Sequence, residues 1–139
     1  MAPLPQIKRP KGKPIETDAT ILELGPDFNN IRALSVAEVG ILLDHQAKDS
    51  GRAFTKTFNS TLEYAKKFSR FSAAESVKDV RNIFAEKNFA HYEVAQLVNL
   101  CCDTAEEAKT LIPSLKKKMN DPELEGLLTS MLTYKKYQG

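Results

Sequence analysis

The segment Val98–Leu115, VNLCCDTAEEAKTLIPSL, decides the fold class, because its eighteen residues hold a helix end, a capped turn, a second helix and a proline stop. Thr104-Ala-Glu-Glu107 has the capping-box spacing, in which the threonine hydroxyl accepts a hydrogen bond from the amide three residues on. Pro113 then prevents the helix from continuing, since proline has no N–H to donate. The segment therefore predicts short helices joined by tight turns, and it contains no catalytic motif.

The same signals recur on both sides of this segment. Ser35-Val-Ala-Glu38 and Ser72-Ala-Ala-Glu75 have the spacing of capping boxes, and Asp121-Pro122 offers an N-cap followed by a proline at the first helical position. Apolar residues follow each start at helical spacing, and Gly51 is suited to close the first helix. The sequence predicts an all-α bundle of about six helices, over roughly 35–49, 52–68, 72–86, 91–100, 105–112 and 122–136.

Composition divides the chain of 139 residues into three parts. Residues 1–18 hold four of the seven prolines and the basic side chains of Lys8, Arg9, Lys11 and Lys13, so we expect a flexible basic arm. Residues 19–50 contain a short extended-looking run and the first helix. Residues 51–139 supply the rest of the helical bundle, within which 72–139 has short connections and is predicted to form a sub-bundle.

The run Ala19–Leu24, ATILEL, does not fit an all-helical domain, and Gly25-Pro26-Asp27 ends it as a turn. A lone strand would leave its amides and carbonyls unpaired. The run is therefore an irregular loop on the bundle, a strand paired with a second copy, or a strand added to the sheet of another protein. The first helix is also apolar over a wide arc, which indicates two surfaces to bury against.

The overall composition narrows the class of protein. The formal charge is only +2, which favours neither nucleic acid nor membrane, and no apolar run approaches the ~20 residues of a membrane helix. The N-terminus lacks the apolar middle of a secretory signal. The two cysteines, Cys101 and Cys102, are adjacent and poorly placed to bridge each other, so we expect a reducing compartment, cytosol or nucleus.

Residues capable of catalysis are sparse. His45 and His91 are the only histidines, and the spacing of His91, Cys101, Cys102 and Asp103 does not match a zinc motif. A Cys–His nucleophile pair has no better support, and no glycine-rich phosphate loop is present. We therefore predict two core cysteines, no metal, no cofactor and no enzyme.

Two kinds of basic site remain. Lys116, Lys117 and Lys118 could contact phosphate, although a solvated loop also explains them. Aromatic residues flank basic ones at Phe68-Ser-Arg-Phe71 and Tyr134-Lys-Lys-Tyr137, an arrangement that can bind nucleic acid but is more often part of a core.

Several blocks together resemble a known family, the fourth subunit of RNA polymerase II. The segment 99–115 is similar to the helix–turn–helix near the family's C-terminus, with Thr-Ala-Glu-Glu and Leu-Ile-Pro-Ser-Leu. The other blocks follow in the family's order: Leu34-Ser-x-x-Glu-Val with Leu42-Leu43, Leu62-x-Tyr-x-x-x-Phe68-Ser-Arg-Phe71, Asp121-x-Glu-Leu, and the end at Tyr134–Tyr137. The resemblance covers about residue 19 to the C-terminus. It departs at the short connection 49–52, where some members have acidic inserts, and at the basic arm.

The resemblance implies a non-catalytic chain with an HRDC-like bundle, located in the nucleus with the cytoplasm as a further location. It would pair as an obligate heterodimer with the seventh polymerase subunit, an OB-fold protein. The pair would form a stalk near the RNA exit channel of the RNA polymerase II core, act in initiation, and contact nascent RNA through the partner. The family's N-terminal strand joins the partner, which would make Ala19–Leu24 an added strand.

The partner-binding residues expected on this basis are Thr20, Ile21, Leu22, Leu24, Phe28, Val36, Val39, Leu42 and Leu43. Two alternatives keep the same fold: an independent HRDC-like module that binds nucleic acid, with Lys116, Lys117 and Lys118 as contacts, or the equivalent subunit of another RNA polymerase. A small cytosolic enzyme is the third, and it would need a metal or a reactive cysteine.

Overall fold

The computed structural model describes residues 16–29, 31–49 and 53–135. Within these ranges the chain forms six α-helices and two short 3-10 helices, in agreement with the predicted all-α class. Their bounds are η1 Ala19–Ile21, α1 Val36–Asp49, α2 Lys56–Phe68, α3 Ala74–Ala85, α4 His91–Leu100, α5 Ala105–Leu111, η2 Pro113–Lys117 and α6 Asp121–Leu132. None of these helices is long and apolar enough to cross a membrane.

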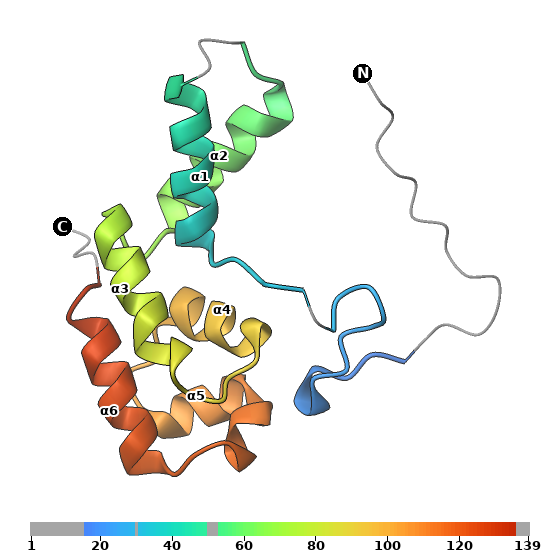
Figure 1. Cartoon of the computed structure of the whole chain (residues 1–139), viewed down its shortest axis with the longest axis vertical. Helices are drawn as coiled ribbons and strands as arrows, with labels where there is room; N and C mark the ends of the chain where they lie inside the picture. The colour runs from blue at the N-terminus through green and yellow to red at the C-terminus, as the bar shows by residue number, and fades with distance from the viewer. Residues whose placement is uncertain (1–15, 30, 50–52, 136–139) are drawn as a thin grey trace.

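The helices form two groups (Figure 1). α1 and α2 lie side by side as a hairpin that stands above the bundle of α3, α4, α5 and α6. The segment that precedes α1 runs along the side of this bundle, and η1 lies beside η2. The first turn of α1 therefore lies where the N-terminal segment meets the bundle, and this bundle is built from the second half of the chain.

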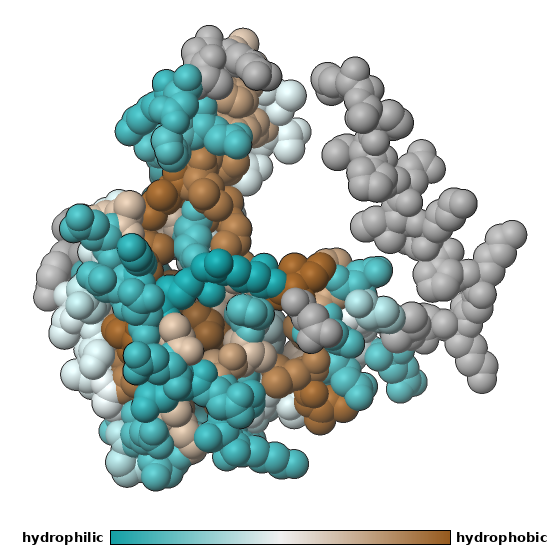
Figure 2. Space-filling view, viewed as in Figure 1, coloured by the Kyte–Doolittle hydropathy of each residue, from teal (hydrophilic) through white to brown (hydrophobic). Residues whose placement is uncertain are grey.

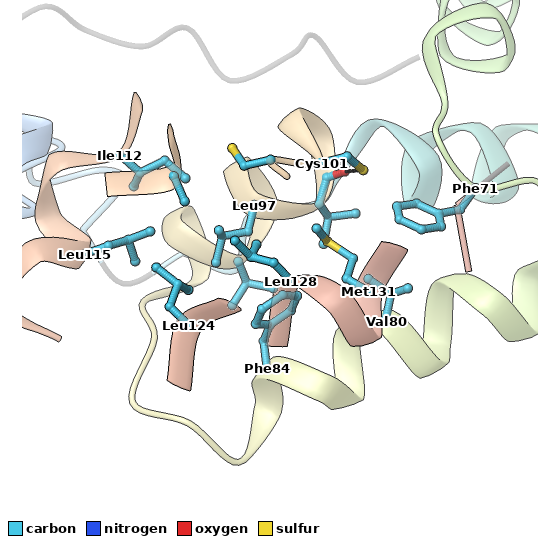
Figure 3. Packing of buried hydrophobic residues seen from close by; sticks show 14 of the residues in the cluster. Phe71, Val80, Phe84, Leu97, Cys101, Ile112, Leu115, Leu124, Leu128 and Met131 are labelled. Carbon is cyan, nitrogen blue, oxygen red and sulfur yellow. Dashed lines mark hydrogen bonds between the residues drawn. The ribbon is translucent and has the colours of Figure 1, made fainter. Parts of the chain in front are cut away.

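The hydrophobic core lies between α3, α4, α5, η2 and α6 (Figure 3). All its buried members except Ala37 of α1 fall between Phe71 and Met131. The largest fully buried apolar side chains are Phe71, Phe84, Leu97, Ile112, Leu115, Leu124, Leu128 and Met131. The hairpin therefore adds little to the enclosed core. The division into domains at residues 19, 51 and 72 stays a prediction.

One of the predicted capping boxes forms in full, at Ser35, and a second forms in part, at Thr104. The Ser35 amide donates to Glu38 Oε1 at 3.0 Å, and the Glu38 amide donates to Ser35 Oγ at 3.2 Å. At α5 the Glu107 amide donates to Thr104 Oγ1 at 3.1 Å, while the Glu107 carboxylate accepts from the Asp103 amide instead of that of Thr104. These caps satisfy amides that have no partner inside the helix.

Three predicted helix starts are wrong. α3 begins at Ala74 after an Ala73 N-cap, so Ser72 does not cap it. α6 is capped by Asn120, whose Oδ1 accepts from the Glu123 amide at 3.0 Å, one residue before the predicted Asp121. α2 begins at Lys56 instead of Arg52, because the Thr55 hydroxyl accepts from the Phe58 amide at 3.1 Å. The predicted closure at Gly51 lies outside the described residues.

The strand that the family resemblance implies at Ala19–Leu24 is not formed in the chain by itself. The segment folds as the 3-10 turn η1, which agrees with the irregular loop among the three alternatives. The Asp18 carboxylate accepts from the Thr20 amide at 2.9 Å, which starts the turn, and Leu22 has a left-handed conformation with φ 62° that reverses the chain. Asp18 and Glu23 then pair through an isolated antiparallel bridge. The segment satisfies its own backbone locally, so it is a compact loop here. Of the predicted flexible arm, residues 1–15 lie outside the described residues.

Candidate partner-binding site

Large apolar side chains on the surface gather in the N-terminal part of the chain. Ten are exposed among the described residues, and half of them lie between residues 21 and 42: Ile21, Phe28, Ile31, Leu34 and Leu42. Figure 2 shows hydrophobic surface on the segment before α1 and on the α1–α2 hairpin. Clustered exposed apolar side chains mark interaction sites more often than single ones do.

A groove of about 470 Å³ lies between α1 and α3. Its apolar lining comes from Leu34, Ile41, Leu42, Ala74 and Val77. The polar part of the groove lining comes from Arg32, Lys78, Arg81, Asn82 and the carboxylate of Glu38, which caps α1. A groove with an apolar floor and cationic sides can bind an apolar segment that carries acidic residues at its edges.

An ion pair fixes the first turn of α1 against α3, at the side of this groove. Arg81 Nε donates to Glu38 Oε2 at 2.8 Å, and Arg81 Nη2 donates to Glu38 Oε1 and to the Ala33 carbonyl. Burial works to raise the pKa of Glu38, but the hydrogen bonds from Arg81 and from Ser35 outweigh it and hold the pKa below its ordinary value. Glu38 therefore stays ionised and keeps α1 in place.

Two further contacts set the position of α1. The Asn99 side chain on α4 accepts from the Val36 amide at 2.8 Å, so α4 caps the start of α1. Gly40 packs on α2, where a Cβ at residue 40 would lie 3.4 Å from the Ala65 Cβ. A Cβ there would make a van der Waals contact with Ala65, so α1 and α2 already pack closely at this point. α1 is thus held from three sides while Leu42 stays exposed.

The predicted partner-binding residues divide by exposure. Thr20, Ile21, Phe28 and Leu42 are exposed, whereas the other five are half-buried: Leu22, Leu24, Val36, Val39 and Leu43. The structure brings Leu42 into the α1–α3 groove and places Val36 on the opposite side of α1, in a hollow beside α2 and α4. Their role in binding stays a prediction.

Comparison with known proteins bears on the identity of this fold. The family described as RNA polymerase Rpb4 matches residues 16–135. The chain belongs to this family. The "DNA-directed RNA polymerase II subunit rpb4" of Dictyostelium discoideum is 37% identical over 153 residues, which covers 96% of this chain and 97% of the relative.

Other members give the same picture. The relative named rpb4 in Schizosaccharomyces pombe is 39% identical and covers 88% of this chain and 95% of its own length. The "DNA-directed RNA polymerase II subunit 4" of Arabidopsis thaliana is 30% identical over 88% of this chain and 96% of its own length. The sequence-based recognition of the family is therefore confirmed. The HRDC-like label of the bundle stays a prediction.

Sequence reasoning missed four residues of this Rpb4-family surface. Ile31 and Leu34 are exposed apolar side chains between the Gly25 turn and the Ser35 cap, outside any periodic pattern. For Leu34 the position directly before the Ser35 N-cap was the available signal, because a residue there often packs on the helix that follows. Ile31 lacked this signal. Arg81 and Asn99 carried no such signal, since their partners on α1 are 43 and 63 residues away.

The three lysines considered as phosphate contacts differ from one another. Lys116 and Lys117 are exposed on η2. Lys118 is not a free cation, because its ammonium lies 3.1 Å from Glu93 Oε1 and donates to the Asn88 carbonyl at 2.8 Å. Glu93 is fully buried and also accepts from Ser114 Oγ at 2.7 Å. Lys118 therefore belongs to a buried polar network and does not fit the alternative of a solvated loop, while the role of the three lysines as phosphate contacts stays a prediction.

The cysteines and histidines do not come together. Cys101 and Cys102 are free and buried, as predicted for core residues. Burial raises the pKa of Cys101 to about 11, and it raises the pKa of Cys102 as well. His45 Nδ1 lies 2.8 Å from Asp49 Oδ2, and both of these exposed side chains belong to α1. Within the described ranges no group of three or more His, Cys, Asp or Glu side chains is placed to hold a metal ion.

Proposed function

We propose that the chain is a non-catalytic subunit of DNA-directed RNA polymerase II that works in the nucleus. The match to the Rpb4 family over residues 16–135 carries this proposal, and its relatives are named as subunits of that polymerase. We further propose that it forms a heterodimer with the OB-fold seventh subunit. The pair would form the stalk near the RNA exit channel and act in initiation.

The concentration of exposed apolar side chains between residues 21 and 42 supports the heterodimer. Ile21 and Phe28 offer side chains beside the bundle, and Leu34 and Leu42 offer them at the α1–α3 groove. Burying one such leucine removes its remaining apolar surface from water and stabilises a complex by about 1 kcal/mol, since about half of the side chain is exposed beforehand. The contact would be made by side chains, because η1 presents a 3-10 turn and not a free strand edge.

The test compares two leucines with the same exposure. Leu42 on α1 is 52% exposed and Leu111 on α5 is 51% exposed. The chain is co-expressed with the seventh subunit, and the amount of partner that co-purifies is measured. We expect Leu42→Asp to reduce the co-purified partner at least tenfold, because a carboxylate would enter the apolar contact. Leu111→Asp should leave it unchanged.

Each outcome has a definite meaning. Equal loss with Leu111→Asp would show that the chain contacts its partner through the bundle instead. If Leu42→Asp retains the full amount of co-purified partner, α1 is not part of the interface. A wild-type chain that fails to co-purify with the seventh subunit, or with any other polymerase II subunit, would contradict the proposed function as a whole. Far-UV circular dichroism confirms that both variants are folded, which is expected because both side chains face solvent.

A further inference from the structure

A second surface lies on the other side of α1, and Val36 is the one predicted partner-binding residue that lines it. Tyr64 and Phe68 on α2 are 58% and 51% exposed, and their ring centroids lie 4.6 Å apart at an interplanar angle of 42°. They border a hollow of about 290 Å³ together with Arg70 and Asn99. Two adjacent aromatic rings beside a hollow offer π faces on which a planar group can stack.

Cations surround these rings. The Lys67 ammonium lies 5.6 Å from the centre of the Phe68 ring, and Arg70 lines the hollow itself. Lys135 lies three residues beyond the end of α6. Its charge and that of Arg70 lower the pKa of the Cys101 thiol, against the effect of burial. Within the described residues none of these three cations forms an ion pair. Arg70 and Lys135 therefore both lie within electrostatic range of Cys101, the residue that follows α4.

The net charge around the Tyr64 and Phe68 rings limits the kind of anion that can bind there. Asp103 also acts on Cys101, and the C-terminal ends of α2, α4 and α6 each carry about half a negative charge. Three full positive charges exceed these contributions by only a small margin. This net positive charge is too small to bind a long run of phosphates. It is sufficient for one or two phosphates next to stacked bases.

Hydrogen-bond donors complete the surface. The Asn99 Oδ1 accepts from the Val36 amide, so its NH₂ group is the part that can donate to a ligand in the hollow. Arg70 offers a planar guanidinium, which can contact a phosphate or stack on a base. We propose that Tyr64, Phe68, Arg70 and Asn99 form a binding site for a short stretch of single-stranded RNA, with bases stacked on the two rings.

The test measures binding of the full chain to a fluorescein-labelled, unstructured 12-nucleotide RNA by fluorescence anisotropy at several salt concentrations. Tyr64→Leu keeps an apolar side chain but removes the ring, so it should weaken binding about tenfold. Tyr64→Phe keeps the ring and should change the affinity less than twofold. The charge variant Arg70→Gln/Lys135→Gln should weaken binding at least fivefold, against less than twofold for the matched pair Lys116→Gln/Lys117→Gln on η2.

The salt dependence provides a second readout. A site that binds one or two phosphates of a single strand gives a slope of log K against log salt of about −0.7 to −1.4. A slope several times steeper, or equal losses in both charge pairs, would show diffuse attraction to basic residues and would overturn the proposal. Absence of binding at 20 mM salt would also overturn it.

Pairing with the seventh subunit is measured on the same variants, so that the two proposals fail separately. Tyr64→Leu should reduce RNA binding while the co-purified partner is unchanged. If Tyr64→Leu releases the partner and leaves RNA binding intact, the surface is a protein interface and the RNA site is wrong. If Leu42→Asp releases the partner and RNA binding persists, both proposals stand.

Discussion

The N-terminal part of the molecule, residues 16–49, and the bundle from Phe71 to Met131 treat apolar side chains in opposite ways. The bundle encloses most of them, with Leu100 and Leu111 as exposed exceptions, and it also buries the carboxylate of Glu93 together with its partners. The N-terminal part leaves Ile21, Phe28 and Leu42 at the surface, although α1 itself is firmly held by Arg81 and Asn99. A fixed helix that exposes apolar side chains is suited to binding, and the bundle supplies the stability that holds it there.

A matched pair of leucines tests this contrast with the largest expected effect. Leu128 is fully buried on α6, so Leu128→Ala should lower the free energy of unfolding by about 3 kcal/mol through lost burial and a cavity. Leu42→Ala on α1 should lower it by only about 1 kcal/mol, because about half of that side chain already faces water. Urea denaturation followed by far-UV circular dichroism measures both, and equal losses would contradict the division.

The buried carboxylate gives the next effect. Lys118→Met would leave Glu93 enclosed without its cation, and we expect a loss of about 2 kcal/mol in the free energy of unfolding. Lys117→Met removes the same charge from the exposed neighbour and should cost less than about 0.5 kcal/mol. A double variant with Glu93→Gln should recover part of the loss. Additive losses in the double variant would show that the two side chains are not coupled.

The helix pattern could be predicted from sequence because its signals are local. The Ser35 capping box, the Thr104 N-cap and the Pro113 stop act within a few residues, and the structure has them. The buried role of Glu93 could not be predicted, since an acid in the first turn of a helix normally faces solvent, and its partners Ser114 and Lys118 come from beyond the next helix.

The departure from a strand at Ala19–Leu24 has a different origin. Alternating Thr, Leu and Leu side chains fit a strand by period, but six residues are too few to distinguish a strand from a turn. The Asp18 side-chain hydrogen bond to Thr20 and the left-handed Leu22 settled the conformation locally. Leucine seldom adopts a positive φ, so no residue preference indicated this turn. The expectation that this segment binds a partner comes from its apolar composition and the family resemblance, and it stays a prediction.

The junction between the two regions gives a smaller, pH-dependent effect. Arg81→Met removes the hydrogen bonds that hold the pKa of Glu38 below its ordinary value, and it should cost about 1 kcal/mol at pH 7. Because the pKa of Glu38 is lowered in the folded state, its contribution is present above about pH 4.3 and is lost as the pH falls through the folded-state pKa. The difference in unfolding free energy between wild type and Arg81→Met should therefore shrink between pH 5 and pH 3. A difference that is constant with pH would show that Arg81 acts by packing alone.

Thiol labelling gives the smallest change and separates the two regions by accessibility. Burial raises the pKa of Cys101 to about 11, so at pH 8 only about one thiol in a thousand is ionised. Iodoacetamide should leave Cys101 and Cys102 unmodified for an hour at pH 8, whereas a cysteine introduced by Leu42→Cys should react within minutes. Mass spectrometry of the intact chain counts the added groups, and labelling in urea confirms that the native thiols can react. Rapid modification of the native pair without urea would mean that the end of α4 opens readily. In that case the bundle would not be the rigid support that the exposed side chains of α1 require.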